Sequence, residues 1–134
     1  KAVARSNCKV AIVASGSMSH QIWENRLVEE GFNSISREFN KQVDLRALQL
    51  WEEGQWATFL RMLPEYAQYC TGEGKMHDTA MLFGAIGWDQ YQGQAEIVCP
   101  YFESSGTGQV VVSLPVAGIP AVAARCEAAE MALA

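Results

Sequence analysis

Two histidines and one glutamate are the residues of this chain that are best suited to chemistry. His20 closes a short Ser/Gly-rich segment that follows an apolar run over residues 10–14. Glu73 stands between two glycines, and the only other histidine, His77, comes shortly after it. Imidazoles and carboxylates act as general acids, general bases and metal ligands, while glycines let the backbone bend and approach a ligand closely. A functional interpretation therefore rests on His20, Glu73 and His77.

The elements that must position these residues can be predicted from hydrophobic spacing. The continuous apolar run at 10–14 predicts a buried parallel strand, because both faces of such a strand are covered. His20 would then lie just beyond the end of that strand. Open α/β sheets gather their functional residues at this place.

A long amphipathic helix is expected over residues 35–51, where apolar residues recur at helical spacing. Ser34 is a candidate cap and Gly54 a stop signal. The apolar stripe favours a place in the core over a cofactor pocket. The charged residues near this helix are expected on a solvated face, and they are Asp44, Arg46, Glu52 and Glu53.

Two more helices are expected before the next strands. One begins at Trp56 and is interrupted by Pro64, because proline lacks the amide hydrogen that the helical ladder needs. The other covers residues 76–86 and is closed by Gly87.

The sequence of the carboxy-terminal third of the chain predicts two strands and a helical tail. Residues 95–99 and 109–114 are rich in β-branched residues, with a Ser/Gly-rich loop at 104–108 between them. The element order predicts an α/β fold with a central mixed sheet flanked by helices. We expect one functional half-domain over residues 1–116 and an alanine-rich helical tail over 117–134.

Composition narrows the class of protein. The 134 residues, 49% hydrophobic and 19% charged, fit one ordinary globular domain. A net charge of -5 argues against a nucleic-acid partner, and no apolar stretch is long enough to cross a membrane. A cytoplasmic location is therefore expected. Because the first residue is Lys1 rather than Met, the chain is expected to be either a piece of a longer protein or a processed subunit.

Cysteine spacing argues against a zinc knuckle or a dithiol redox pair, because no CxxC pair occurs. Reduced thiols are expected instead. The cysteines are Cys8, Cys70, Cys99 and Cys126.

Four motifs in a fixed order resemble a known enzyme family. They are Ser15-Gly-Ser-Met-Ser-His20, Met62-Leu-Pro-Glu65, Gly72-Glu-Gly-Lys-Met-His-Asp78 and Ser104-Ser-Gly-Thr-Gly-Gln109. From Lys9 to Val116 the chain resembles the carboxy-terminal half of the class III extradiol dioxygenases, which are related to the protocatechuate 4,5-dioxygenase beta subunit. Within the family the resemblance is to the homoprotocatechuate 2,3-dioxygenase branch, with 2-aminophenol 1,6-dioxygenases next.

The resemblance implies a metal and two catalytic roles. The family holds non-haem Fe(II) with two histidines and one glutamate, leaving one side of the metal open for a catecholate and O2. By resemblance, Glu73 is the metal-binding glutamate. His20 is the acid/base group that takes a proton from the substrate hydroxyl and later returns one, which suits an imidazole near neutral pH.

Further roles are implied around these two residues. Ser104, Ser105 and Thr107 would line the substrate pocket and hold a ring substituent or its carboxylate. His77 and Asp78 are candidates for a second layer around the metal, and His77 for a metal ligand or an oriented base, but capping and packing at a helix start is the favoured interpretation of this pair.

One departure from the family pattern affects the whole prediction. The two metal-binding histidines of the family come from an amino-terminal half that has no counterpart here. A separate amino-terminal half or a partner subunit must therefore supply two His ligands, within a homo- or hetero-oligomer.

The predicted function is ring opening of a catechol with an acidic side chain, such as 3,4-dihydroxyphenylacetate, using O2. Two alternatives remain at this point: an enzyme that opens the ring of a 2-aminophenol, and a metal-free structural or regulatory subunit that packs against a catalytic chain.

Overall fold

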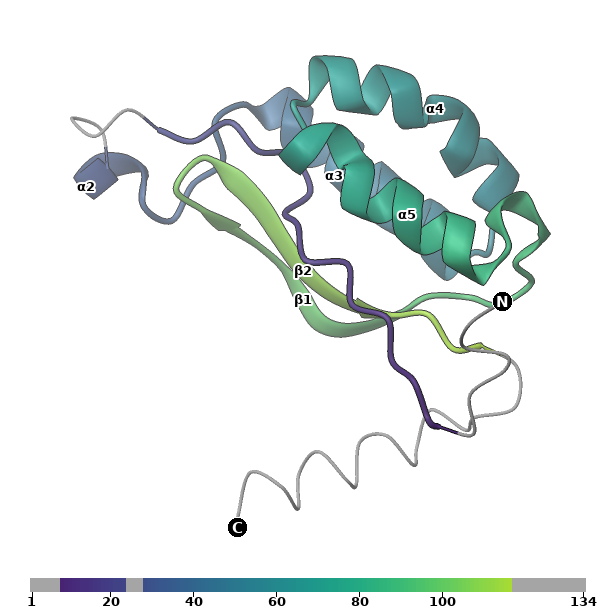
Figure 1. The fold of residues 1–134 in the computed structure, drawn as a ribbon. Coiled ribbons are helices and arrows are strands. Elements are labelled where there is room, and N and C mark those ends of the chain that lie inside the picture. Colours follow the sequence, from purple (N-terminus) through teal and green to yellow (C-terminus); the bar gives the residue numbers. More distant parts are fainter. Residues whose placement is uncertain (1–7, 24–27, 117–134) are drawn as a thin grey trace, which may run out of the picture.

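The computed structural model describes residues 8–23 and 28–116, and its three longer helices lie together on one side of a β-hairpin (Figure 1). The elements in chain order are α2 (Val28–Gly31), α3 (Glu38–Glu52), α4 (Trp56–Tyr69), the 3-10 helix η2 (Glu73–Met76), α5 (His77–Ile86), the 3-10 helix η3 (Trp88–Gln90), β1 (Glu96–Ser104) and β2 (Thr107–Ser113). The predicted mixture of helices and strands is confirmed. In this part of the chain the sheet is one antiparallel pair, β1 and β2.

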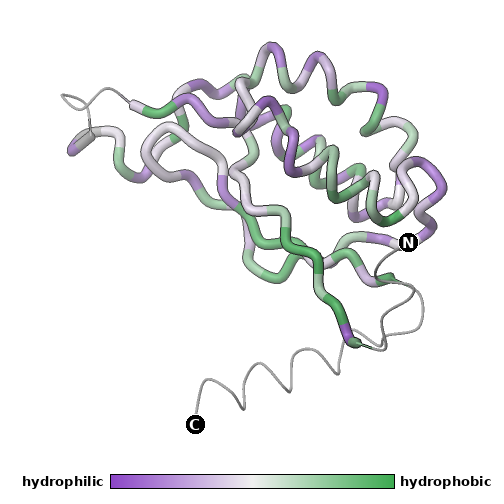
Figure 2. Tube along the Cα trace, in the orientation of Figure 1, coloured by the Kyte–Doolittle hydropathy of each residue, from purple (hydrophilic) through white to green (hydrophobic). Residues whose placement is uncertain are grey.

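The strand predicted over residues 10–14 is wrong. These residues adopt no regular secondary structure, and the side chain of Val13 is 82% exposed. An apolar run indicates that something should cover it, but it pairs as a strand only where a neighbouring strand is available. In the described part of the chain residues 10–14 pair with no strand, and Figure 2 shows the hydrophobic character of this segment.

Helix α3 begins later than predicted, at Glu38, and its cap position is Arg37 rather than Ser34. The Ser34 hydroxyl instead donates to the Gly31 carbonyl oxygen at 3.1 Å. Residues 34–36 stay outside the helix because they bind the hairpin turn, where the Ser36 amide donates to the Gly106 carbonyl oxygen at 3.2 Å. A tertiary contact therefore outweighs the helical periodicity at this end.

Helix α4 runs through Pro64, which was expected to interrupt it. Pro64 is exposed, while Phe59, Leu63 and Tyr66 on the opposite side are buried. Burial of this apolar face keeps the helix continuous despite the missing amide hydrogen at Pro64. Helix α5 ends where predicted, at Gly87, whose φ of 114° is left-handed.

The loop predicted over residues 104–108 is in fact a tight turn, and both strands extend into it. Ser104 pairs with Thr107, so only Ser105 and Gly106 connect β1 to β2. Their φ angles of 51° and 90° are both positive, as a type I′ hairpin turn requires. The turn is packed between other segments, because the Ser105 amide donates to the Phe32 carbonyl oxygen at 2.8 Å.

An aromatic cluster forms the core between the helices. The rings of Trp51 and Phe59 meet edge to face with centroids 5.1 Å apart, and the rings of Trp56 and Phe83 lie at the same centroid distance. Burial of these rings, with Tyr91 beside Trp56, holds α3, α4 and α5 together.

The remaining sequence predictions concern cysteines, membranes and the tail. Cys8, Cys70 and Cys99 are free thiols, as expected, and Cys126 lies outside the described residues. Among the described residues, every helix is too short or too polar to cross a membrane. The helical tail predicted over 117–134 also lies outside the described residues.

Candidate active site

Backbone hydrogen bonds fix His20 between the hairpin and the loop before Glu73. The Met18 amide donates to the Gly108 carbonyl oxygen at 2.9 Å, and the Gly108 amide donates to the Ser19 carbonyl oxygen at 3.0 Å. The His20 amide donates to the carbonyl oxygen of Thr71 at 3.2 Å. The segment that carries His20 therefore cannot shift independently of β2.

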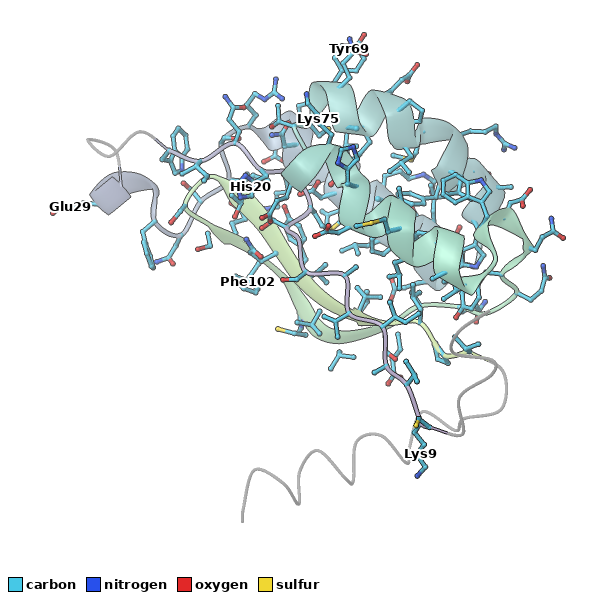
Figure 3. The ribbon with its side chains drawn as sticks, viewed as in Figure 1. Lys9, His20, Glu29, Tyr69, Lys75 and Phe102 are labelled. Atoms are coloured by element: carbon cyan, nitrogen blue, oxygen red, sulfur yellow. The ribbon has the colours of Figure 1, made fainter. Side chains whose placement is uncertain are left out.

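Glu73 meets His20 at this place although the two are far apart in the sequence. The Glu73 amide donates to the Met18 carbonyl oxygen at 3.2 Å, which brings the start of η2 to the His20 segment. Glu73 Oε2 lies 3.8 Å from His20 Nε2. The side chains are 28% exposed for His20 and 42% exposed for Glu73, so a ligand can reach both. In Figure 3 His20 lies between the hairpin and the helical layer.

Electrostatics keep Glu73 in its charged form. The Ser17 backbone amide donates to Glu73 Oε2 at 2.6 Å, and this bond is the main reason why the pKa of Glu73 is lowered. Burial opposes this effect on the pKa less strongly than the amide bond acts, and the Ser17 side chain and the nearby His20 lower the pKa by smaller amounts. The site therefore presents a carboxylate, a form that can bind a cation.

The backbone after Glu73 is strained. Gly74, Lys75 and Met76 have φ angles of 54°, 59° and 61°, and only glycine adopts this region freely. Each non-glycine residue there costs about 1–2 kcal/mol. Met76 is 2% exposed, and its burial helps to hold this conformation. Such strain persists only where the surrounding structure holds the backbone in place.

Of the predicted pair at the start of α5, the structure brings Asp78 to the site. A Cβ atom added to Gly16 would lie 3.3 Å from Asp78 Oδ2 and 3.8 Å from the Glu73 Cβ, so Asp78 and Glu73 border the same glycine. His77 is exposed, and no side chain caps α5. The predicted role of this pair around a metal stays a prediction.

The three predicted substrate-binding residues have different positions. Thr107 is 5% exposed and forms an isolated antiparallel bridge with His20, so it lies next to the imidazole-bearing residue. The Thr107 hydroxyl donates to the Ser104 carbonyl oxygen at 2.7 Å, across the hairpin turn that includes Ser105. Their role in substrate binding stays a prediction.

Two residues that the structure places near the site were not predicted to belong to it. Gln109 donates from Nε2 to the hydroxyl oxygens of Ser17 and Thr107, each at 2.7 Å. Its signal was its place at the end of the last motif, on the strand that carries Thr107.

Asp44 is the second residue, and the expectation that it lies on a solvated face is wrong. It is completely buried and accepts hydrogen bonds from the Ser19 amide and from the hydroxyls of Ser19, Tyr66 and Tyr101. Its spacing from the buried Ala47 and Leu48 in α3 places it on the apolar face, which the sequence could have indicated.

One candidate metal ligand is present rather than a complete set. In residues 8–23 and 28–116, no group of three His, Cys, Asp or Glu side chains is arranged to hold a metal ion. The charged, accessible carboxylate of Glu73 is suited to serve as one metal ligand.

The hairpin and the helical layer bring a histidine and a charged glutamate to one accessible place. The chain belongs to the family described as the catalytic LigB subunit of aromatic ring-opening dioxygenase, which matches residues 1–115. A similar protein is the 3,4-dihydroxyphenylacetate 2,3-dioxygenase of Escherichia coli, which is 49% identical over 105 residues. The match covers 78% of this chain and 38% of that protein, so the chain spans well under half of its relative's length. The resemblance inferred from the motifs is confirmed.

Proposed function

We propose that this chain is the part of an extradiol ring-cleavage dioxygenase that carries its metal-binding glutamate and its acid/base histidine. The observation that supports this most directly is the convergence of Glu73 Oε2 and His20 Nε2 at 3.8 Å on an accessible surface. Membership of the ring-opening dioxygenase family supports the reaction class. The substrate is a catechol with an acidic side chain, such as 3,4-dihydroxyphenylacetate, which the name of the Escherichia coli relative supports.

The metal is Fe(II), and Glu73 is its ligand from this chain. The lowered pKa of Glu73, caused mainly by the Ser17 amide, supports a charged oxygen ligand at neutral pH. When bound, ferrous iron supplies open coordination positions for the catecholate and O2, together with the electron transfer that ring opening requires. Two histidines from an amino-terminal half or a partner subunit complete the set of ligands, because the described residues hold no group of three.

His20 moves the protons of the reaction. Its imidazole accepts a proton from a substrate hydroxyl and returns one when the bond between the oxygen atoms breaks. Backbone bonds on both sides of His20 support this role, because an acid/base group must stay within hydrogen-bond distance of the reacting atom. Thr107, with Ser104 and Ser105 at the hairpin turn, holds the substituent of the ring.

The test is a pair of substitutions in the complete dioxygenase with its amino-terminal part present. Glu73→Ala should lose iron, because the ligand set loses one oxygen donor and a negative charge. His20→Ala should keep iron and slow oxygen uptake by about 10²-fold or more. Glu53→Ala, at an exposed position after α3, is the matched control and should change neither quantity.

Two results would contradict the proposal. Full iron content in Glu73→Ala would contradict the role of Glu73 as a metal ligand. Full activity in His20→Ala would contradict the role of His20 as the acid/base group. Faster turnover of a 2-aminophenol than of a catechol would favour the aminophenol alternative. A complete protein without iron or oxygen uptake would favour the structural or regulatory subunit.

A further inference from the structure

One amide side chain connects the two halves of the candidate site. Gln109 lies on β2, and its Nε2 is 2.7 Å from Ser17 Oγ and 2.7 Å from Thr107 Oγ1. Ser17 binds the Glu73 carboxylate, and Thr107 is bridged to His20. Gln109 therefore contacts one neighbour of each proposed functional residue.

The hydrogen bonds hold Ser17 at both its side chain and its backbone. The Gln109 amide nitrogen can only donate, so the Ser17 hydroxyl oxygen accepts its hydrogen bond at 2.7 Å. The Ser17 backbone amide donates to Glu73 Oε2 at 2.6 Å. Gln109 therefore holds the residue whose amide binds the carboxylate.

We propose that Gln109 is a positioning residue that holds the Ser17 side chain and thereby fixes the Ser17 amide that orients the Glu73 carboxylate toward the metal. This inference rests on the proposed function, because it takes Glu73 as the metal ligand. The Ser17 amide lies 2.6 Å from Glu73 Oε2, so a shift of Ser17 changes the orientation of the carboxylate. Groups that orient a metal ligand in this way change metal affinity by about 10- to 100-fold when they are removed.

Packing alone predicts a different outcome from this proposal. Gln109 is only partly buried, so a leucine of similar volume can occupy its place without a large loss of stability. If Gln109 only fills space, Gln109→Leu should leave metal binding unchanged. If its amide orients Ser17, Gln109→Leu should weaken metal binding while the melting temperature barely changes.

The first experiment measures the dissociation constants of Fe(II), without oxygen, and of Mn(II) in the complete dioxygenase. Gln109→Leu should weaken both by about 10-fold. Gln109→Glu should weaken them too although it keeps the shape, because a carboxylate can no longer donate to the Ser17 and Thr107 hydroxyl oxygens. Gln68→Leu, at an exposed position on α4, is the control and should match the wild-type protein. Metal affinities of Gln109→Leu and Gln109→Glu equal to wild type would overturn the proposal.

The second experiment asks whether Gln109 acts through Ser17. Ser17→Ala should weaken metal binding by itself, and adding Gln109→Leu to it should change the affinity by less than about 2-fold, because coupled residues are not additive. The same factor in both backgrounds would overturn the proposal. If Gln109→Leu does not fold, the cycle is measured with Gln109→Glu.

A third variant separates this inference from the proposed function. Glu73→Ala with unchanged metal affinity would mean that the proposed function fails. Loss of metal in Glu73→Ala together with wild-type affinity in Gln109→Leu would mean that only the role of Gln109 fails. The Ser17 amide proton of the 134-residue chain gives a readout without metal, and its NMR shift should change in Gln109→Leu but not in Gln68→Leu.

Discussion

The buried carboxylate of Asp44 gives the sharpest test of how this fold supports its site. Asp44 Oδ1 accepts from the Ser19 amide at 3.2 Å and from the Tyr66 hydroxyl at 2.6 Å. Asp44 Oδ2 accepts from the Ser19 hydroxyl at 2.7 Å and from the Tyr101 hydroxyl at 2.8 Å. One side chain of α3 thus joins α4, β1 and the residue before His20.

Asp44→Leu keeps the volume and removes every acceptor. Ser19 is 0% exposed and Tyr66 is 2% exposed, so their donors would remain buried without partners. Each such donor costs about 1–3 kcal/mol, which gives a loss of about 4 kcal/mol for the group when incomplete additivity is allowed for. For a chain of this length that loss lowers the melting temperature by roughly 12 °C or more.

The matched variant is Asp44→Asn, whose amide oxygen still accepts and whose nitrogen can donate to the hydroxyl oxygens. It should lose less than about 1.5 kcal/mol at neutral pH. Urea unfolding of the wild-type chain and both variants, followed by circular dichroism, gives the free energies. A loss below about 1 kcal/mol in Asp44→Leu, or equal losses in the two variants, would refute the reasoning.

The pH dependence of folding stability provides an independent test of the role of Asp44. Burial, which outweighs the hydrogen bonds from Tyr66, Ser19 and Tyr101, raises the pKa of Asp44 above its ordinary value of 3.8. A raised pKa in the folded state means that the stabilisation by Asp44 is fully present below the unfolded pKa and is lost as pH rises through the folded one. The stability of the wild-type chain relative to Asp44→Asn should therefore decrease from about pH 4 toward neutral pH. An increase over the same range would contradict this.

Two further stability predictions concern the backbone. Gly106→Ala should lose about 2 kcal/mol or more, because φ is 90° and the new Cβ would clash with the Gln21 carbonyl oxygen. The control is Gly84→Ala, at a helical position where a new Cβ meets open space. Its free energy of unfolding should rise by about 0.5–1 kcal/mol. A similar loss of stability in both variants would argue against the clash. Pro64→Ala should stabilise the chain by about 1 kcal/mol or more by restoring a helical hydrogen bond in α4, and thermal unfolding that shows destabilisation would contradict this.

Local sequence signals predicted the presence of the helices better than the residues at which they begin and end. The apolar spacing found α3 and α4, because a period of 3.6 residues is a property of neighbouring positions. The run over residues 76–86, closed by Gly87, predicted α5. The start of α3 was misplaced because residues 34–36 bind the hairpin turn instead of joining the helix. The effect of Pro64 was misjudged because burial of the opposite face of α4 is a tertiary contribution.

The sequence by itself determined the family and the residues whose side chains are suited to catalysis or metal binding. Motif order connected His20 and Glu73 to ring-opening dioxygenases, and the family match agrees with that interpretation. Residue type and the order of motifs do not depend on folding.

Only the tertiary structure decided which groups meet. The approach of Glu73 to His20, the burial of Asp44 beside Ser19 and the bonds from Gln109 all join residues that are distant in the sequence. The physical reason is that a hydrogen bond depends on distances of about 3 Å and on direction. Distances of that kind are fixed by the packing of α3, α4 and the hairpin against one another, and no local spacing in a single sequence contains them.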